Sequence, residues 1–145
     1  MSENEALASA KTVSEPVSLR HVTANSVALP HPLPKPTSRT GQMESTLSLW
    51  EAGPYTSTGV WECEPGEFSA VRDTCTEVCQ ILSGTATVHG DDGTSVRLAA
   101  GSLLVLPIGW RGTWVIHEKI RKTYVLVGGA SEPEPIDPCA DPVVE

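Results

Sequence analysis

Two segments, EVCQILSG (77–84) and GSLLVLPIG (101–109), contain the strongest structural signal in the chain. Each combines a short apolar run with glycine punctuation, and the second ends in a Pro-x-Gly turn. Similar short runs surround them, separated by Gly, Pro and Asp residues. Many short strands at such regular spacing are typical of an all-β sandwich or barrel. We predict strands at 46–50, 59–63, 68–72, 77–82, 85–89, 95–98, 103–106, 113–117 and 123–127.

The composition limits the classes to which the protein can belong. Its 145 residues suffice for one domain, and 18 acidic against 10 basic side chains give a net charge of −8. Such a chain lacks the positive patch of a nucleic-acid-binding protein, and no run approaches the ~20 apolar residues of a membrane span. The first residues show no secretory signal, and the four cysteines form neither a zinc pattern nor a disulfide scaffold. We expect a cytoplasmic protein without nucleic-acid or membrane partners.

The distribution of proline, charge and large apolar residues predicts four regions. Residues 1–15 are small and polar, and we expect a disordered leader. Residues 16–45 include PHPLPKPT (30–37), whose prolines exclude a helix and favour an extended arm. Most large apolar residues lie in 46–129, which we expect to form the barrel. Residues 130–145 are acidic and rich in proline, as in a disordered tail.

The two segments described first resemble parts of two motifs of the cupin superfamily. EVCQILSG is similar to the second half of the first motif, in which a Glu precedes a Gly by seven positions, and GSLLVLPIG is similar to the first half of the second, G-x5-P-x-G. GVWEC (59–63), GWRGTW (109–114) and RKTY (121–124) resemble a subgroup related to (S)-ureidoglycine aminohydrolase, many of whose members have unknown function. The resemblance spans about 50–127. It implies an all-β double-stranded β-helix, a jelly-roll-like small barrel, and a homodimer.

The resemblance also implies where a metal would bind. Typical cupins hold Mn, Fe, Ni or Zn with two or three His and one Glu. The matching positions of this chain are Val71 and Asp73 or Ala70 and Arg72, then Glu77, then Gly112. Glu77 alone retains a ligand, and one carboxylate cannot fix a transition metal. We expect no metal cofactor, although Glu77 with Asp73 would form an incomplete, weak site for a hard divalent cation.

Strand alternation predicts which side chains of segment 77–82 enter the barrel. Glu77, Cys79 and Ile81 share the inward face. A buried carboxylate needs a partner, and the resemblance to the cupin family implies Lys122 and Arg72 as the nearest candidates. Glu77 is then either half of a structural ion pair or a carboxyl of raised pKa that acts as a catalytic acid or base.

Cysteine, histidine and aromatic residues complete the candidate site. Cys79 is expected to behave as a small hydrophobic residue, because no inward His is available to activate it. All four histidines are expected at the surface, His117 because it alternates with the inward Gly112. Trp61 and Trp114 are expected to face the barrel, where they either fill it or form the wall of a pocket. The candidate ligand-binding residues are Glu77, Cys79, Trp114, Lys122 and Tyr124.

Three functions fit these observations. The first is a binding protein that holds a small polar metabolite in the barrel without a His-ligated metal. The second is an enzyme resembling ureidoglycine aminohydrolase, with Glu77 as the candidate catalytic residue, although the chain lacks the His ligands of that class. The third is a structural or interaction subunit, which the Pro-rich arm and the acidic tail favour.

Overall fold

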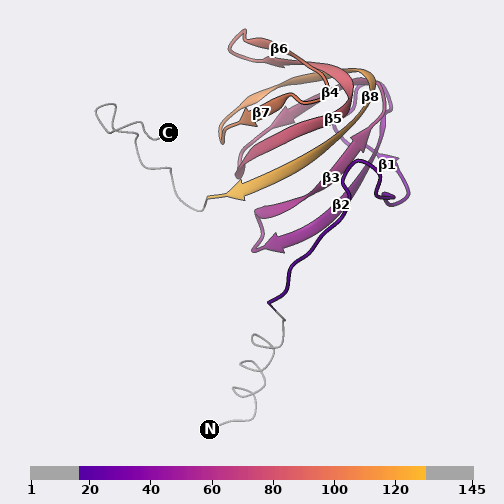
Figure 1. The fold of residues 1–145 in the computed structure, drawn as a ribbon. Coiled ribbons are helices and arrows are strands. Elements are labelled where there is room, and N and C mark those ends of the chain that lie inside the picture. The colour runs from indigo at the N-terminus through magenta and orange to yellow at the C-terminus, as the bar shows by residue number, and fades with distance from the viewer. Residues whose placement is uncertain (1–16, 130–145) are drawn as a thin grey trace.

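The computed structural model describes residues 17–129. Within this range there are eight strands and no helix, and all named strand pairs are antiparallel (Figure 1). The all-β prediction is therefore confirmed. The strands are β1 (Leu33–Pro34), β2 (Met43–Ala52), β3 (Thr56–Cys63), β4 (Gly66–Val71), β5 (Cys75–Gly90), β6 (Ser95–Leu98), β7 (Leu103–Leu106) and β8 (Arg111–Gly128).

Strands β5 and β8 are each longer than the sequence predicted. The predicted strands 77–82 and 85–89 form one continuous β5, and 113–117 and 123–127 form one continuous β8. The register between them shifts at Ile81/Ser83, Ser83/Thr85 and Thr85/Ala86. Gly84, at φ 87°, lies within this irregular stretch. A β-bulge bends a strand without ending its hydrogen-bonded pairing with the neighbouring strand. Gly84 therefore lies at a bend within β5, and not at the turn between two strands that a glycine at this position predicts.

Strands β5 and β8 bend and run through both halves of one eight-stranded sheet, so that these halves form two facing sheets. The first half of β5 pairs with the second half of β8. On the other side of β5 lies β7, and beyond β8 follow β3, β2 and β1 in that order. The second half of β5 and the first half of β8 pair with each other, with β6 and β4 at the edges. The ribbon curls around the space between these sheets (Figure 1). This is the small barrel expected from the resemblance.

The core lies between the two sheets. Trp61, Phe68 and Trp114 contact one another, with ring centroids 5.9 to 6.2 Å apart. Buried aliphatic side chains such as Ile81 and Ile120 pack with them. Side chains of the predicted inward positions are thus buried together, because alternate residues of each strand face the opposite sheet.

The segment before β2 runs along the outside of the barrel. Arg121 donates hydrogen bonds from Nη1 to the carbonyl oxygens of Ala24 and Val27, at 2.8 and 3.0 Å. Further along, β1 pairs with the start of β2. The strand predicted at 46–50 begins at Met43, inside the range assigned to the arm. The predicted leader 1–15 and tail 130–145 lie outside the described residues.

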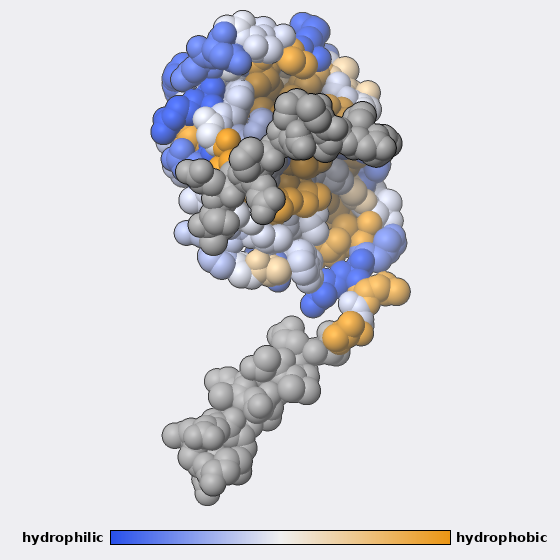
Figure 2. All heavy atoms as spheres, turned by 90° about the vertical axis from the view of Figure 1, so that its left-hand side faces the viewer, coloured by the Kyte–Doolittle hydropathy of each residue, from blue (hydrophilic) through white to orange (hydrophobic). Residues whose placement is uncertain are grey.

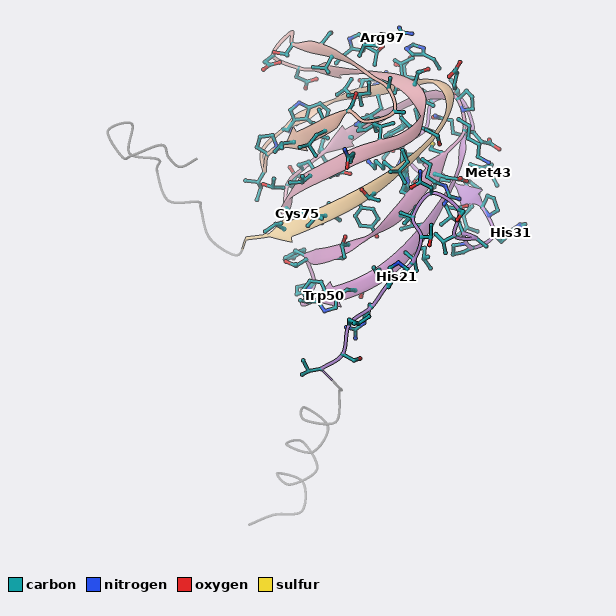
Figure 3. The ribbon with its side chains drawn as sticks, in the orientation of Figure 1. His21, His31, Met43, Trp50, Cys75 and Arg97 are labelled. Carbon is teal, nitrogen blue, oxygen red and sulfur yellow. The ribbon has the colours of Figure 1, made fainter. Side chains whose placement is uncertain are left out.

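The surface contains both polar and apolar regions. Figure 2 shows hydrophobic residues in the middle of one face, with hydrophilic residues toward its margins. Exposed apolar side chains include Leu103 and Val105 of β7 and Val125 and Val127 of β8. Trp50 lies near the end of β2 (Figure 3), and its side chain is exposed. In residues 17–129, no helix has the length and apolar character to cross a membrane.

Candidate functional site

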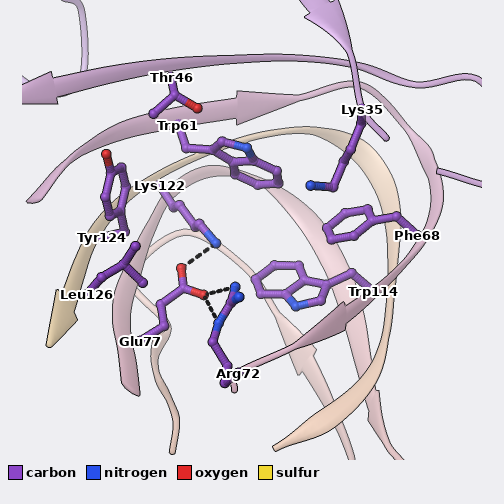
Figure 4. Close-up of a pocket in the computed structure, with 10 residues that line it drawn as sticks. All are labelled: Lys35, Thr46, Trp61, Phe68, Arg72, Glu77, Trp114, Lys122, Tyr124 and Leu126. Atoms are coloured by element: carbon purple, nitrogen blue, oxygen red, sulfur yellow. Dashed lines mark hydrogen bonds and ion pairs between the residues drawn. The ribbon is translucent and has the colours of Figure 1, made fainter. Parts of the chain in front are cut away.

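A cavity of about 190 Å³ lies between the two sheets, next to the aromatic core. Its wall combines four aromatic side chains with four charged side chains, a composition typical of small-molecule sites (Figure 4). The lining residues are Lys35, Thr46, Trp61, Phe68, Arg72, Glu77, Trp114, Lys122, Tyr124 and Leu126.

Glu77 forms the centre of a buried ion network. Its side chain is 3% exposed, and Lys122 Nζ lies 2.6 Å from its Oε2. Arg72 reaches Oε1 with Nη2 at 2.5 Å and with Nε at 3.1 Å. Both partners named from the sequence therefore contact Glu77 at once, one on each carboxylate oxygen (Figure 4).

The two cations determine the protonation state of Glu77. Burial alone would raise the pKa of this carboxyl, but the charges of Lys122 and Arg72 and their hydrogen bonds outweigh it and lower the pKa below 4.5. The hypothesis that Glu77 is a catalytic acid or base requires a raised pKa, which is the opposite shift. The geometry instead favours an ionised Glu77 that fixes Lys122 and Arg72 in place.

Lys122 is enclosed by aromatic rings as well as by Glu77. Its Nζ lies 4.4 Å from the ring centroid of Trp61 and 4.5 Å from that of Trp114. The negative faces of indole rings attract a cation at such distances, most strongly where water is excluded. Lys122 is thus a buried cation with three anionic or π partners, which explains how a lysine can be 5% exposed in a barrel interior.

Lys35 reaches the same cavity from the Pro-rich segment. The residue follows β1, and its backbone N–H donates to the carbonyl oxygen of Gln42. Its Nζ lies 3.1 Å from Glu44 Oε1 and 4.3 Å from the ring centroid of Phe68. Glu44 Oε1 also accepts a hydrogen bond from Trp61 Nε1 at 2.8 Å. The arm therefore contributes a side chain to the candidate site.

The other residues predicted for the site have different positions. Trp114 and Tyr124, both named as candidates from the sequence, line the cavity. Trp114 Nε1 is buried and has no hydrogen-bond partner within residues 17–129. Cys79 is buried among apolar side chains but is not part of the cavity wall, and burial raises the pKa of its thiol to about 11. The structure thus places Cys79 beside the site and not in it.

Asp73 does not join Glu77. Its side chain is 61% exposed and lies 3.5 Å from Arg111 Nη2 on the outside of the barrel. All four histidines are exposed, and His117 Nε2 lies 2.8 Å from Thr87 Oγ1. Figure 3 shows His21 and His31 on the segment before β2. The expectation of surface histidines agrees with these positions.

The donor set does not fit the transition metal that the cupin resemblance implies. Both oxygens of Glu77 are engaged by cations. A Cβ added at Gly112 would lie 2.2 Å from the carbonyl oxygen of His89 and 2.5 Å from the ring of Trp110, so a ligand side chain has no room there. Across residues 17–129, no three His, Cys, Asp or Glu side chains are grouped closely enough to hold a metal ion. A transition metal needs three or four such donors.

Several lining residues had not been assigned to the site from the sequence. Lys35, Thr46, Phe68 and Leu126 belong to this group. For Thr46, Phe68 and Leu126 the signal was strand alternation, which places each on the inward face of its strand. For Lys35 the signal was weak: a single lysine within a Pro-rich run, whose position depends on the pairing of β1 with β2.

The fold, with a cavity between its two sheets, is that of a small cupin-type barrel. The model of the EutQ-like cupin domain matches residues 50–124, which is more than half of the chain, and the protein belongs to this family. No curated protein sequence matches the chain.

Solved structures of related fold agree with this assignment. The EutQ protein of Clostridium difficile is 20% identical with a TM-score of 0.57, and the match covers 68% of this chain and 78% of that chain. A putative ethanolamine utilization protein Q from Salmonella typhimurium is 18% identical with a TM-score of 0.52, covering 59% and 70%. A DUF861-family protein of unknown function from Pseudomonas syringae is 17% identical with a TM-score of 0.58, covering 77% and 45%. Such similarity shows the fold alone.

Proposed function

We propose that the protein binds a small polar metabolite in its barrel without a His-ligated metal. The observation that supports this most directly is the cavity in which Glu77 holds Lys122 and Arg72 between aromatic walls. Polar groups fixed in advance lower the entropic cost of binding. Aromatic rings add a surface on which a flat molecule can stack.

The size of the cavity limits the ligand. The volume of the cavity is about 190 Å³. Pockets for drug-sized ligands are larger, at roughly 300–1,000 Å³. The metabolite is therefore compact, with only a few rotatable bonds.

The protonation and burial of the reactive side chains favour binding over catalysis. Lys122 and Arg72 hold Glu77 in its ionised form and lower its pKa, so it is a weak base toward a substrate proton. Cys79 lies outside the cavity wall and its thiol has a raised pKa, so it is a poor nucleophile. An activity like that of ureidoglycine aminohydrolase would require one of these groups to act differently.

The test is a thermal-shift screen with small polar metabolites, performed with and without a chelator. A bound ligand raises Tm because it stabilises only the folded state. We expect at least one compound to raise Tm equally in both conditions. A shift that disappears with EDTA and returns with added metal would overturn the metal-free proposal, and ammonia release from ureidoglycine by the wild-type protein would favour the hydrolase.

A further inference from the structure

The charge of the cavity wall differs in sign from that of the whole protein. Three lining side chains are cationic, Lys35, Arg72 and Lys122, and one is anionic, Glu77. Glu44 pairs with Lys35 but does not line the cavity. When Glu44 is included, the site has three positive and two negative side chains, a net charge of +1. The chain as a whole has a net charge of −8. A buried site that retains a positive excess within an acidic protein favours an anionic ligand.

Two of the three cations retain donors for such a ligand. Within residues 17–129, Glu44 is the only hydrogen-bonding partner of Lys35 Nζ, which leaves two of its three N–H groups. Arg72 uses two N–H groups on Glu77 and one on the carbonyl oxygen of Val71, which leaves two of its five. Figure 4 shows both side chains pointing toward the space between Trp61, Phe68 and Trp114.

The third cation has a different role. Lys122 is 6% exposed at its side chain, bonded to Glu77 and placed between two indole rings. Ammonium groups of Lys122 and Lys35 already lie over the rings of Trp61, Trp114 and Phe68, which reduces the attraction of these rings for a cationic ligand. A second cation in this space would be repelled by both lysines and by Arg72.

We propose that the ligand is a small, flat organic monocarboxylate, whose carboxylate is bound by Lys35 and Arg72 and whose apolar body lies against Trp61 and Trp114. This inference rests on the proposed function and adds the charge and shape of the ligand. A carboxylate matches the remaining N–H groups because hydrogen bonds between ionised partners are the strongest in proteins.

The experiment uses three probes of nearly equal shape: benzoate, benzamide and benzylammonium. Each is titrated into the full-length protein by calorimetry at neutral pH, and the indole N–H signals of the tryptophans are followed by NMR. We expect saturable binding of benzoate, binding of benzamide weaker by tenfold or more, and no binding of benzylammonium. A tenfold loss is the approximate effect of removing one hydrogen bond to a charged group.

Two lysine variants provide the matched comparison. Lys35→Met removes the charge but keeps the length of the side chain, and we expect it to weaken benzoate binding about tenfold. Lys119→Met removes the same charge from a side chain that is 65% exposed on the outside, and we expect no effect on binding. Circular dichroism and Tm show whether each variant remains folded.

The outcomes separate this inference from the proposed function. Equal binding of benzoate and benzamide, with shifts of the indole signals, would overturn the carboxylate assignment but leave a metabolite-binding barrel. Benzoate binding that Lys35→Met and Lys119→Met leave unchanged would overturn the role of Lys35. If benzoate does not bind, the carboxylate assignment is wrong, and the chelator-controlled metabolite screen decides the proposed function independently.

Discussion

Lys122 Nζ lies 2.6 Å from Glu77 Oε2, and the two side chains are only 6% and 3% exposed. Neither charge could remain at this depth alone, because the cost of removing an ion from water is large. Arg72 completes the set on the second carboxylate oxygen. The interior of the barrel is therefore arranged around a fixed carboxylate that holds two cations.

Replacing Glu77 tests the energetic part of this arrangement. Glu77→Gln leaves Lys122 buried without a counter-charge, and we expect a loss of about 3–5 kcal/mol in the free energy of unfolding. The control is Glu67→Gln, which breaks the exposed pair with Arg39 and should cost at most about 1 kcal/mol. Urea denaturation measures both. Equal losses in the two variants would show that the buried network does not stabilise the fold.

The pH dependence of stability follows from the same carboxyl group. Because Lys122 and Arg72 outweigh the effect of burial, the pKa of Glu77 is lower in the folded state than its ordinary value near 4.5. Its contribution to stability is complete above that ordinary value and is lost as the pH falls through the folded-state pKa. We expect Tm of the wild type to fall below about pH 4.5, and more steeply than Tm of Glu77→Gln. Parallel curves for the two proteins would contradict this assignment.

Cys63 and Cys79 should resist alkylation in the folded protein. Burial raises the pKa of each thiol to about 11, so at pH 8 only about one thiol in a thousand is the reactive thiolate. We expect iodoacetamide to label both residues at least about a hundredfold more slowly in the native than in the urea-unfolded protein. Peptide mass spectrometry gives the two rates. Fast native labelling of Cys79 would instead indicate an activated nucleophile.

Gly112 occupies a position at which the chain has no space for a side chain. Gly112→Ala would bring a Cβ to 2.2 Å from the carbonyl oxygen of His89, which forces the neighbouring strand to move. We expect a loss of about 1–3 kcal/mol, the range for an overpacked interior. Thermal or urea unfolding checks this value. A variant as stable as the wild type would remove the steric argument against a metal ligand here.

Much of the fold could be predicted from the sequence because strand signals are local. Apolar runs and Gly or Pro punctuation identified nearly every strand, and alternation placed Glu77 and Trp114 on the inward face. The error at Gly84 arose because a glycine in a strand pattern marks either a turn or a bulge. Only the pairing of β5 with β8 distinguishes the two.

The candidate site was less predictable because it depends on contacts between distant segments. Lys122 and Arg72 were named as alternative partners of Glu77, and nothing in the sequence indicated that both contact it at once. Lys35 enters the cavity only because β1 pairs with β2. The register of this pairing depends on the two residues of β1, Leu33 and Pro34. Alternation predicts the face of the strand on which a side chain lies, but not whether that side chain reaches the cavity. It therefore placed Cys79 in the site although this residue lies outside the cavity wall.

The central claim is that Lys122 and Arg72, and not a metal ion, neutralise Glu77 in the binding site. Metal content measures this most directly. Tag-free protein is soaked with Mn, Fe, Ni and Zn, desalted, and analysed by mass spectrometry of the elements, with Glu77→Gln in parallel. The account predicts well below one metal per chain in every sample. Near-stoichiometric metal in the wild type that is lost in Glu77→Gln would contradict it.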